Sequence, residues 1–329
     1  MSANWTVAVT VPVRPEGRPS FERALGAGAT AAFLADMRDV ERLEALREAD
    51  AMVAWQWRAE VREEERSELG RVRFLQLISA GVDGVPFADI PGHIAVSGNV
   101  GAYAEPMAEH VMAMVLALAK RLRELHARMA DGEFDHFSFT RRLAGSACGI
   151  LGYGGIGQAV ARLMRAFGGS IHAINTSGRT DDPVAFVGTL EDLDEVLAAS
   201  DVLVITLPLT RRTYGLIGKR ELDLMKPDAI LVNVARAAIV EEQALFEHLR
   251  AEPRFSAALD VWWNEPIGQG EFRTDFPFFD LPNILGSPHD SGLVPGSIEF
   301  AAVRAAENVG RFLRGEPVTG VVQREDYPG

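Results

Sequence analysis

Three glycines in one short turn have the spacing of a site that binds a dinucleotide. Residues 147–157 read ACGILGYGGIG, in which Gly152, Gly154 and Gly157 fit the pattern G-x-G-x-x-G. The first glycine of this pattern allows a tight turn, the second lets a pyrophosphate approach the backbone, and the third lets the helix pack closely on the strand. N–H groups at the start of the helix, here including those of Gly155 and Ile156, then face the phosphates. We therefore expect a dinucleotide site; the alternative is a tight turn without a ligand.

The residues after the next expected strand bear on which dinucleotide binds. An NAD site usually has Asp or Glu about 20 residues after the glycines, where it binds the ribose hydroxyls. Asn175 holds that position here, and Ser177 and Arg179 follow, which suits a ribose 2′-phosphate. This favours NADP over NAD, although Asp181 and Asp182 argue in the other direction. The alternative is a solvated loop in which Arg179 points into water.

The elements that must position this turn alternate as in a parallel α/β fold. Short apolar runs predict strands at residues 6–11, 51–54, 74–78, 94–96, 147–151, 171–175, 202–206, 229–233, 255–259 and 283–286. Amphipathic or apolar segments predict helices at residues 40–48, 60–68, 104–123, 156–167, 190–199, 241–250 and 296–314. The pattern predicts two Rossmann-like or flavodoxin-like domains with parallel sheets and an active site in the cleft between them.

The last segment of the chain has no strand partner in the second set, so we expect it to return to the first domain. The predicted substrate-binding domain is therefore discontinuous and comprises residues 1–99 plus 291–329. Residues 100–290 form the predicted dinucleotide-binding Rossmann domain. The expected helix at 104–123 is apolar on most of its circumference, which predicts burial on more than one side, as in a homodimer interface or between domains.

Composition excludes several classes of protein. The net charge of −13 over 329 residues argues against general binding to nucleic acid or an anionic membrane, so an anionic substrate needs a local cationic site. Cys148 is the one cysteine, so we expect no intrachain disulfide and no metal site, and we expect this thiol to be inert. The N-terminus has no basic start or long apolar run, and no apolar stretch is long enough to span a bilayer. We expect a cytoplasmic protein.

Seven stretches, taken in order, resemble the D-isomer-specific 2-hydroxyacid dehydrogenase family, which includes glyoxylate/hydroxypyruvate reductases and phosphoglycerate dehydrogenases. They are SAGVD (79–83), MAEH (107–110), GILGYGGIG (149–157), LPLTRRTYGLIG (207–218), LVNVARAAIV (231–240), ALDVWWNEP (258–266) and SPHDSG (287–292). The resemblance covers nearly the whole chain. Two residues depart from the usual pattern: Ala237 stands where glycine usually follows an arginine, and Asp290 follows the histidine.

The resemblance implies three catalytic residues. Arg236 matches the substrate-binding arginine of the family, Glu265 its acid, and His289 its proton-transfer histidine. Their chemistry suits these roles, since histidine titrates near neutrality, a carboxylate beside it fixes its tautomer, and arginine can grip a carboxylate with two hydrogen bonds. Taken one at a time, each could instead be an ordinary surface or loop residue.

The resemblance also implies the remaining contacts. For the substrate we expect Ser79, Ala80, Gly81 and Val82, through their backbone N–H groups, together with Trp55, Arg236 and His289. For Trp55 the alternative is simple packing in the core. For the cofactor we expect, besides the glycine-rich turn and the segment that follows Asn175, the residues Met107, Leu207, Pro208, Thr213, Val234, Ala235, Arg236, Asp260 and His289. We interpret His110, His172 and His248 as structural or exposed.

The implied activity is hydride transfer between NADP(H) or NAD(H) and a small anionic 2-hydroxy or 2-keto acid. With NADPH the expected direction is reduction of an acid such as glyoxylate or hydroxypyruvate, by a homodimer. Two alternatives stay open: a non-catalytic dinucleotide-sensing interaction protein of the same fold, and a dehydrogenase of another small anion such as formate or phosphite. Glu265 argues against formate, because formate enzymes of this fold have glutamine at the matching place.

Overall fold

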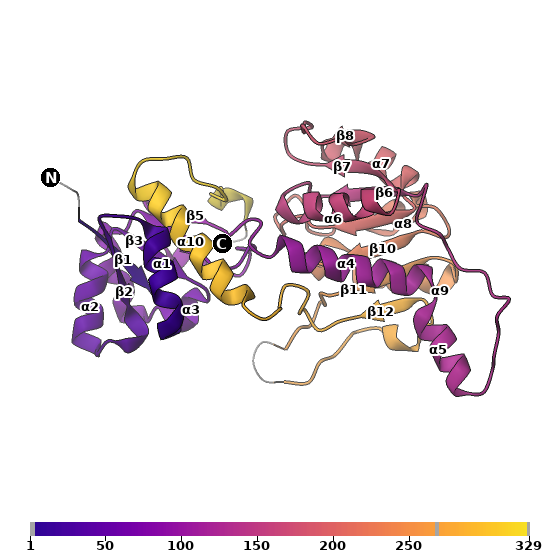
Figure 1. Cartoon of the computed structure of the whole chain (residues 1–329), viewed down its shortest axis with the longest axis horizontal. Coiled ribbons are helices and arrows are strands. Elements are labelled where there is room, and N and C mark those ends of the chain that lie inside the picture. Colours follow the sequence, from indigo (N-terminus) through magenta and orange to yellow (C-terminus); the bar gives the residue numbers. More distant parts are fainter. Residues whose placement is uncertain (1–3, 267–269, 328–329) are drawn as a thin grey trace. The chain divides into compact units, whose positions relative to one another are not determined.

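The computed structural model describes residues 4–266 and 270–327, and the chain divides into two compact units (Figure 1). Unit 1 comprises Met1–Tyr103 and Val294–Gly329, and unit 2 comprises Ala104–Leu293. Every strand pair within the two sheets is parallel. The predicted fold class, two α/β domains with parallel sheets, is confirmed.

Unit 1 contains a five-stranded sheet in the order β2-β1-β3-β4-β5. Its strands are β1 (Trp5–Val9), β2 (Ala29–Phe33), β3 (Ala51–Ala54), β4 (Phe74–Leu77) and β5 (Ala95–Ser97). Its helices are α1 (Arg18–Leu25), α2 (Asp39–Glu48), α3 (Trp57–Glu60) and α10 (Ser297–Leu313). The central strands β3 and β4 are buried along their whole length, as expected of a parallel sheet covered on both faces.

Helix α10 joins unit 1 from the far end of the chain. It lies alongside α1 against one face of the sheet (Figure 1), where Ala301, Ala305 and Val309 are fully buried. The side-chain amide of Asn308 on α10 forms hydrogen bonds with β4 and with the C-terminal segment. Its Nδ2 donates to Gln76 Oε1 at 2.6 Å, and its Oδ1 accepts from the N–H of Thr319 at 3.0 Å. A buried amide with both ends bonded fixes the C-terminal segment to the sheet.

Unit 2 contains a seven-stranded sheet in the order β12-β11-β10-β9-β6-β7-β8. Its strands are β6 (Ala147–Leu151), β7 (Ser170–Ile174), β8 (Phe186–Gly188), β9 (Val202–Ile205), β10 (Ile230–Asn233), β11 (Ser256–Leu259) and β12 (Ile284–Gly286). Its helices are α4 (Ala104–Ala119), α5 (Leu122–Ala130), α6 (Gly155–Ala166), α7 (Leu193–Ala199), α8 (Lys219–Leu224) and α9 (Glu242–Ala251).

The sheet of unit 2 has a topological switch point beside β6. This strand lies between β7 and β9, so the chain winds away from it in both directions. Apolar residues of α4 and α6 cover one face of the sheet, and those of α7, α8 and α9 cover the other. In doubly wound sheets ligands bind beyond the carboxyl ends of the strands at such a point, and the glycine-rich turn directly follows β6.

Several expected elements differ from the observed ones. Strands β2 and β8 were not predicted, because β2 is alanine-rich (ATAAF) and β8 has only three residues, so neither has a strong strand signal. The helix expected at 60–68 is wrong, since the acidic segment Glu63–Arg71 forms 3-10 turns instead. The helix expected at 104–123 ends at Ala119, because Arg121 adopts a left-handed φ of 50° before α5 begins.

Within the described ranges, no helix combines the length and the apolar character needed to cross a membrane.

The bonds of Asn308 give a stability prediction. We expect Asn308→Ala to destabilise unit 1 by about 2 kcal/mol, because it leaves the buried amide of Gln76 on β4 without this bond and releases the Thr319 N–H of the C-terminal segment. Native-state hydrogen exchange of the β4 and β5 amides measures this effect locally. Glu307→Ala, at the exposed position just before it on α10, is the matched control. Equal protection of these amides in both variants would contradict the prediction.

Candidate functional site

The glycine-rich turn has the shape that a pyrophosphate requires. Gly152 has φ +99°, and a Cβ there would lie 2.7 Å from the carbonyl carbon of Thr206. A Cβ on Gly157 would lie 2.4 Å from Gly152 O, so the third glycine permits close packing of α6 on the turn. A Cβ on Gly154, by contrast, would meet nothing within 4 Å. The open side of the turn is therefore at the middle glycine, where a ligand needs to approach the backbone.

Helix α6 starts beside this open side. Gly154 is its N-cap and has no side chain to cap the helix, so the first-turn N–H groups, including those of Gly155 and Ile156, lack an intrahelical acceptor. These groups and the helix dipole suit an anion. The residues present therefore fit a dinucleotide phosphate.

The segment after β7 forms a turn organised by Asn175. Its Oδ1 accepts from the N–H groups of Ser177 at 3.0 Å and Gly178 at 2.7 Å, and its Nδ2 donates to Arg179 O at 2.8 Å. Arg179 is exposed, and its guanidinium has no hydrogen-bond or ion-pair partner in the described part of the chain. Asp182 is engaged elsewhere, since it accepts from the hydroxyl of Tyr153 at 3.0 Å. The turn thus presents a cation without a carboxylate partner.

The other residues predicted to bind the cofactor also lie in unit 2. Leu207, Val234 and Ala235 are buried, Met107 is partly buried on α4, and Pro208 is exposed. Thr213 is buried, and its hydroxyl donates to Pro208 O at 2.7 Å, so it holds the turn after β9 together. For Thr213 a contact with a cofactor stays a prediction.

Arg236 follows β10 and is held by its neighbours on the chain. The side chain of Asn233 accepts from the N–H of Ala235 at 3.0 Å and donates to Arg236 O at 2.9 Å. The Arg236 guanidinium donates from Nη1 to Ala235 O at 2.7 Å. Ala237 does not have a positive φ, so the glycine usual at this place is not needed for the backbone.

Glu265 and His289 form a hydrogen-bonded pair. The Nδ1 atom of His289 lies 2.7 Å from Oε2 of Glu265, and the N–H of Trp262 donates to Oε1 at 2.8 Å. The two residues reach each other from the segments that follow β11 and β12, which are adjacent in the sheet. Because Nδ1 is bonded to the carboxylate, Nε2 is the ring nitrogen left to exchange a proton with a substrate.

The surroundings of Glu265 keep it ionised. Burial opposes the charge, but the hydrogen bonds from His289 and the Trp262 N–H outweigh burial and lower the pKa of Glu265 below its ordinary 4.5. The positive charge of Arg236 acts in the same direction. The structure therefore brings the three predicted catalytic side chains into one electrostatic group within unit 2.

Asp260, the residue that directly follows β11, is fully buried. Its Oδ1 accepts from the hydroxyl of Ser287 at 2.5 Å and the N–H of Asp290 at 3.1 Å, and its Oδ2 accepts from the N–H of Ser291 at 3.1 Å. A contact between Asp260 and the cofactor stays a prediction. The structure shows in addition that this carboxylate binds the side chain of Ser287 before His289 and the backbone N–H groups of Asp290 and Ser291 after it.

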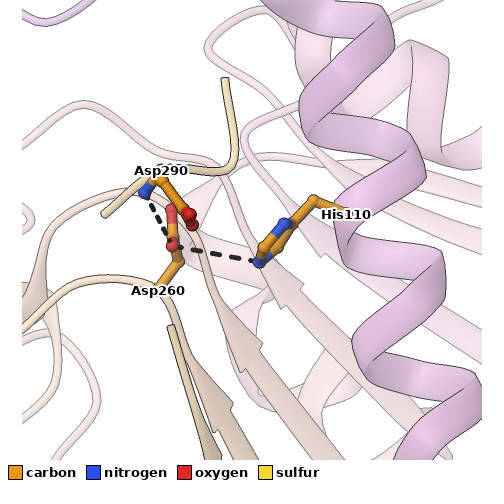
Figure 2. A group of neighbouring side chains, drawn as sticks. All are labelled: His110, Asp260 and Asp290. Carbon is orange, nitrogen blue, oxygen red and sulfur yellow. Dashed lines mark hydrogen bonds and ion pairs between the residues drawn. The ribbon is translucent and has the colours of Figure 1, made fainter. Parts of the chain in front are cut away.

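His110, Asp260 and Asp290 gather closely enough to be considered as metal ligands (Figure 2). Their candidate ligand atoms all lie within 4.8 Å of one another. The carboxylate of Asp260, however, already accepts three hydrogen bonds, which bind it to the protein. We therefore interpret the cluster as a hydrogen-bonded support and not as a metal centre.

The residues predicted to bind the substrate in unit 1 form a compact loop after β4. The hydroxyl of Ser79 donates to Gly81 O at 3.0 Å, Val82 is buried, and Ala80 is partly buried. Trp55, after β3, is also partly buried and packs on the apolar core beneath α10. For Trp55 and residues 79–82 a substrate contact stays a prediction.

Asn233 and Ser287 are site residues that the sequence did not predict, and the interpretation of His110 was a structural or exposed residue. All three lie in the stretches NVARA, SPH and MAEH, so their place inside matched motifs was the available signal. Cys148 is buried within β6, and burial raises the pKa of its thiol to about 12, as suits an inert cysteine.

Comparison with known proteins gives consistent results. Residues 112–291 match the model of the D-isomer specific 2-hydroxyacid dehydrogenase, NAD binding domain. A glyoxylate reductase of Thermococcus gammatolerans is 31% identical over 292 residues, which cover 86% of this chain and 85% of the relative. A glyoxylate/hydroxypyruvate reductase B of Pectobacterium carotovorum is 38% identical over 218 residues, which cover 64% of this chain and 66% of the relative.

A solved structure extends the similarity to the whole chain. The D-isomer specific 2-hydroxyacid dehydrogenase of Xanthobacter autotrophicus, in complex with NADPH and MES, superposes with a TM-score of 0.77 at 25% identity. The match covers 99% of this chain and 100% of that one.

The paired residues give a prediction about pH. We expect Glu265→Gln to lower the free energy of unfolding of unit 2 by about 1 kcal/mol at neutral pH, because it removes a charge-assisted hydrogen bond that is partly exposed to solvent. The pKa of Glu265 is lower in the folded chain than its ordinary 4.5, so this stabilisation is present above that value and is lost as pH falls through the folded pKa. Urea unfolding over this pH range measures it.

The matched control is Glu195→Gln, an exposed glutamate of α7. The prediction is contradicted if Glu265→Gln destabilises unit 2 by the same amount at every pH down to the most acidic. The charge of Glu265 would then contribute nothing to the free energy of unfolding.

Proposed function

Because the chain belongs to the D-isomer specific 2-hydroxyacid dehydrogenase family, we propose that it reduces a small 2-keto acid such as glyoxylate or hydroxypyruvate with NADPH. The membership makes it an oxidoreductase that uses a nicotinamide dinucleotide. The observation that carries the proposal is the 2.7 Å contact between His289 and Glu265 in the charge field of Arg236. The names of the two reductases among its relatives support the choice of acid.

The chemistry divides between the cofactor and the chain. A bound reduced nicotinamide supplies a hydride to the keto carbon, and one proton must reach the keto oxygen. His289 gives that proton from Nε2, since Nδ1 is bonded to Glu265. The ionised carboxylate of Glu265 stabilises the imidazolium before transfer and keeps the ring oriented.

Arg236 prepares the substrate for this transfer. Its guanidinium binds the substrate carboxylate and polarises the keto oxygen, where negative charge develops as the hydride arrives. The bonds from Asn233 hold the backbone of this arginine in place. In a chain of net charge −13, such a local cation is what attracts an anionic acid.

The preference for NADP rests on the turn after β7. An acidic residue there would repel a 2′-phosphate, and this chain has Asn175 instead. The exposed guanidinium of Arg179 is free to bind the phosphate, and the structural relative from Xanthobacter autotrophicus holds NADPH. Assembly as a homodimer and a cytoplasmic location stay predictions from the sequence.

His289→Ala tests the proposed reaction. We expect kcat for glyoxylate reduction to fall about 10²–10⁴-fold, because the proton donor is removed, while the variant still binds NADPH. Steady-state assays with a panel of 2-keto acids, together with cofactor titration, measure both quantities. His93→Ala, at an exposed histidine of unit 1, is the matched control. A wild-type chain that binds NADPH but reduces no acid in the panel would favour the sensing alternative.

Arg179→Ala tests the cofactor preference. We expect kcat/KM for NADPH to fall about 10–100-fold and that for NADH to stay within about threefold, since hydrogen bonds to a charged group contribute about 1.5–3 kcal/mol. Arg254→Ala, an exposed arginine before β11, is the matched control. Equal losses with both cofactors, or no loss at all, would overturn the assignment of Arg179.

A further inference from the structure

A histidine outside the predicted catalytic set contacts the segment that carries His289. His110 projects from α4 toward Asp260, which directly follows β11 (Figure 2). Its Nε2 lies 3.0 Å from the hydroxyl oxygen of Ser287 and 3.9 Å from Oδ1 of Asp260. Ser287 is separated from His289 by a single proline, so a contact at Ser287 acts on the same short segment.

Counting hydrogens fixes the direction of these bonds. The hydroxyl of Ser287 has one hydrogen, and its 2.5 Å contact with the acceptor Asp260 uses it. The bond between Ser287 and His110 must then be donated by His110 Nε2. His110, Ser287 and Asp260 thus form one directed chain of hydrogen bonds that ends on a fully buried carboxylate.

The segment from 287 to 291 needs this support because its backbone is not relaxed. His289 has φ +57°, a left-handed value that residues other than glycine rarely adopt. Asp260 compensates by accepting from the N–H groups of Asp290 and Ser291, directly after it. The indole of Trp262 adds a bond from Nε1 to Ser287 O at 2.9 Å. The conformation that points His289 at Glu265 is therefore imposed from outside the catalytic residues.

We propose that His110 is a positioning residue for the reaction: through Ser287 and Asp260 it holds the segment that presents His289 to Glu265. The proposal rests on the proposed function, in which His289 transfers the proton. His110 itself touches neither substrate nor cofactor in this account. Its donated hydrogen bond orients Ser287, and the oriented Ser287 keeps the Asp260 carboxylate aligned with the two backbone N–H groups.

Two substitutions of His110 distinguish the effect of its hydrogen-bond donor from the effect of the volume of its ring. His110→Phe keeps a planar ring but removes the donor, and His110→Gln keeps an N–H donor near the place of Nε2. We expect kcat for keto-acid reduction to fall about tenfold in His110→Phe, with KM for the acid within about threefold, because transition-state alignment is lost and substrate binding is not. His110→Gln should restore kcat to within about threefold of wild type.

Further variants test whether the loss of kcat is specific to His110 and whether it is transmitted through Ser287. His126→Phe makes the same change at an exposed histidine of α5 and should leave kcat unaltered. Ser287→Ala breaks the same chain of bonds at its middle, so adding it to His110→Phe should cost little more than either change alone. Full kcat in His110→Phe, equal losses in His110→Phe and His110→Gln, or strictly additive losses in the double variant would overturn the proposal.

A measurement without turnover keeps this inference separate from the proposed function. The ring ¹⁵N–¹H signal of His289, assigned by its loss in His289→Ala, reports the bond to Glu265. We expect this signal to shift or broaden in His110→Phe and Ser287→Ala and to stay unchanged in His126→Phe. If the wild type reduced no keto acid, the proposed function would fail while this signal still decided the role of His110. An unaltered signal in His110→Phe would refute that role.

Discussion

The hydrogen bond between His289 and Glu265 is the interaction on which the site depends. It joins segments that follow two adjacent strands, β11 and β12, and it sets which ring nitrogen remains for proton transfer. It also explains why Glu265 stays ionised although it is partly buried, since its bonds to His289 and Trp262 offset the cost of removing the carboxylate from water. The position of Arg236 after β10 adds a cation to the same group.

This pair needs a rigid base, and the buried carboxylate of Asp260 provides it. A fully buried carboxyl group is costly unless its oxygens are hydrogen-bonded, and here one hydroxyl and two backbone N–H groups bind the two oxygens. The bonds from Asp290 and Ser291 fall directly after the left-handed His289. The same hydrogen bonds therefore stabilise both the buried carboxyl group of Asp260 and the strained backbone at His289.

Much of this could be predicted from the sequence because the responsible signals are local. The strands Ala51–Ala54 and Ala147–Leu151 are apolar runs flanked by turn signals, and the glycine spacing after β6 fixes its own turn. Strands β2 and β8 could not be predicted, because β2 is mostly alanine and β8 has only three residues, so pairing with β1 and β7 decides their structure. The contact of His110 with Ser287 spans 177 positions, and the residue type of His289 favours a left-handed φ too weakly to predict it.

A crystal structure of the chain with NADP⁺ and oxamate, an unreactive analogue of a 2-keto acid, tests the central claim most directly. The quantity to measure is the distance from His289 Nε2 to the oxamate oxygen that stands in for the keto oxygen. The account predicts about 2.6–3.2 Å, with Nδ1 still bonded to Glu265 and the oxamate carboxylate on Arg236. An imidazole that has left Glu265, or whose Nε2 faces solvent while oxamate is bound elsewhere, would contradict it.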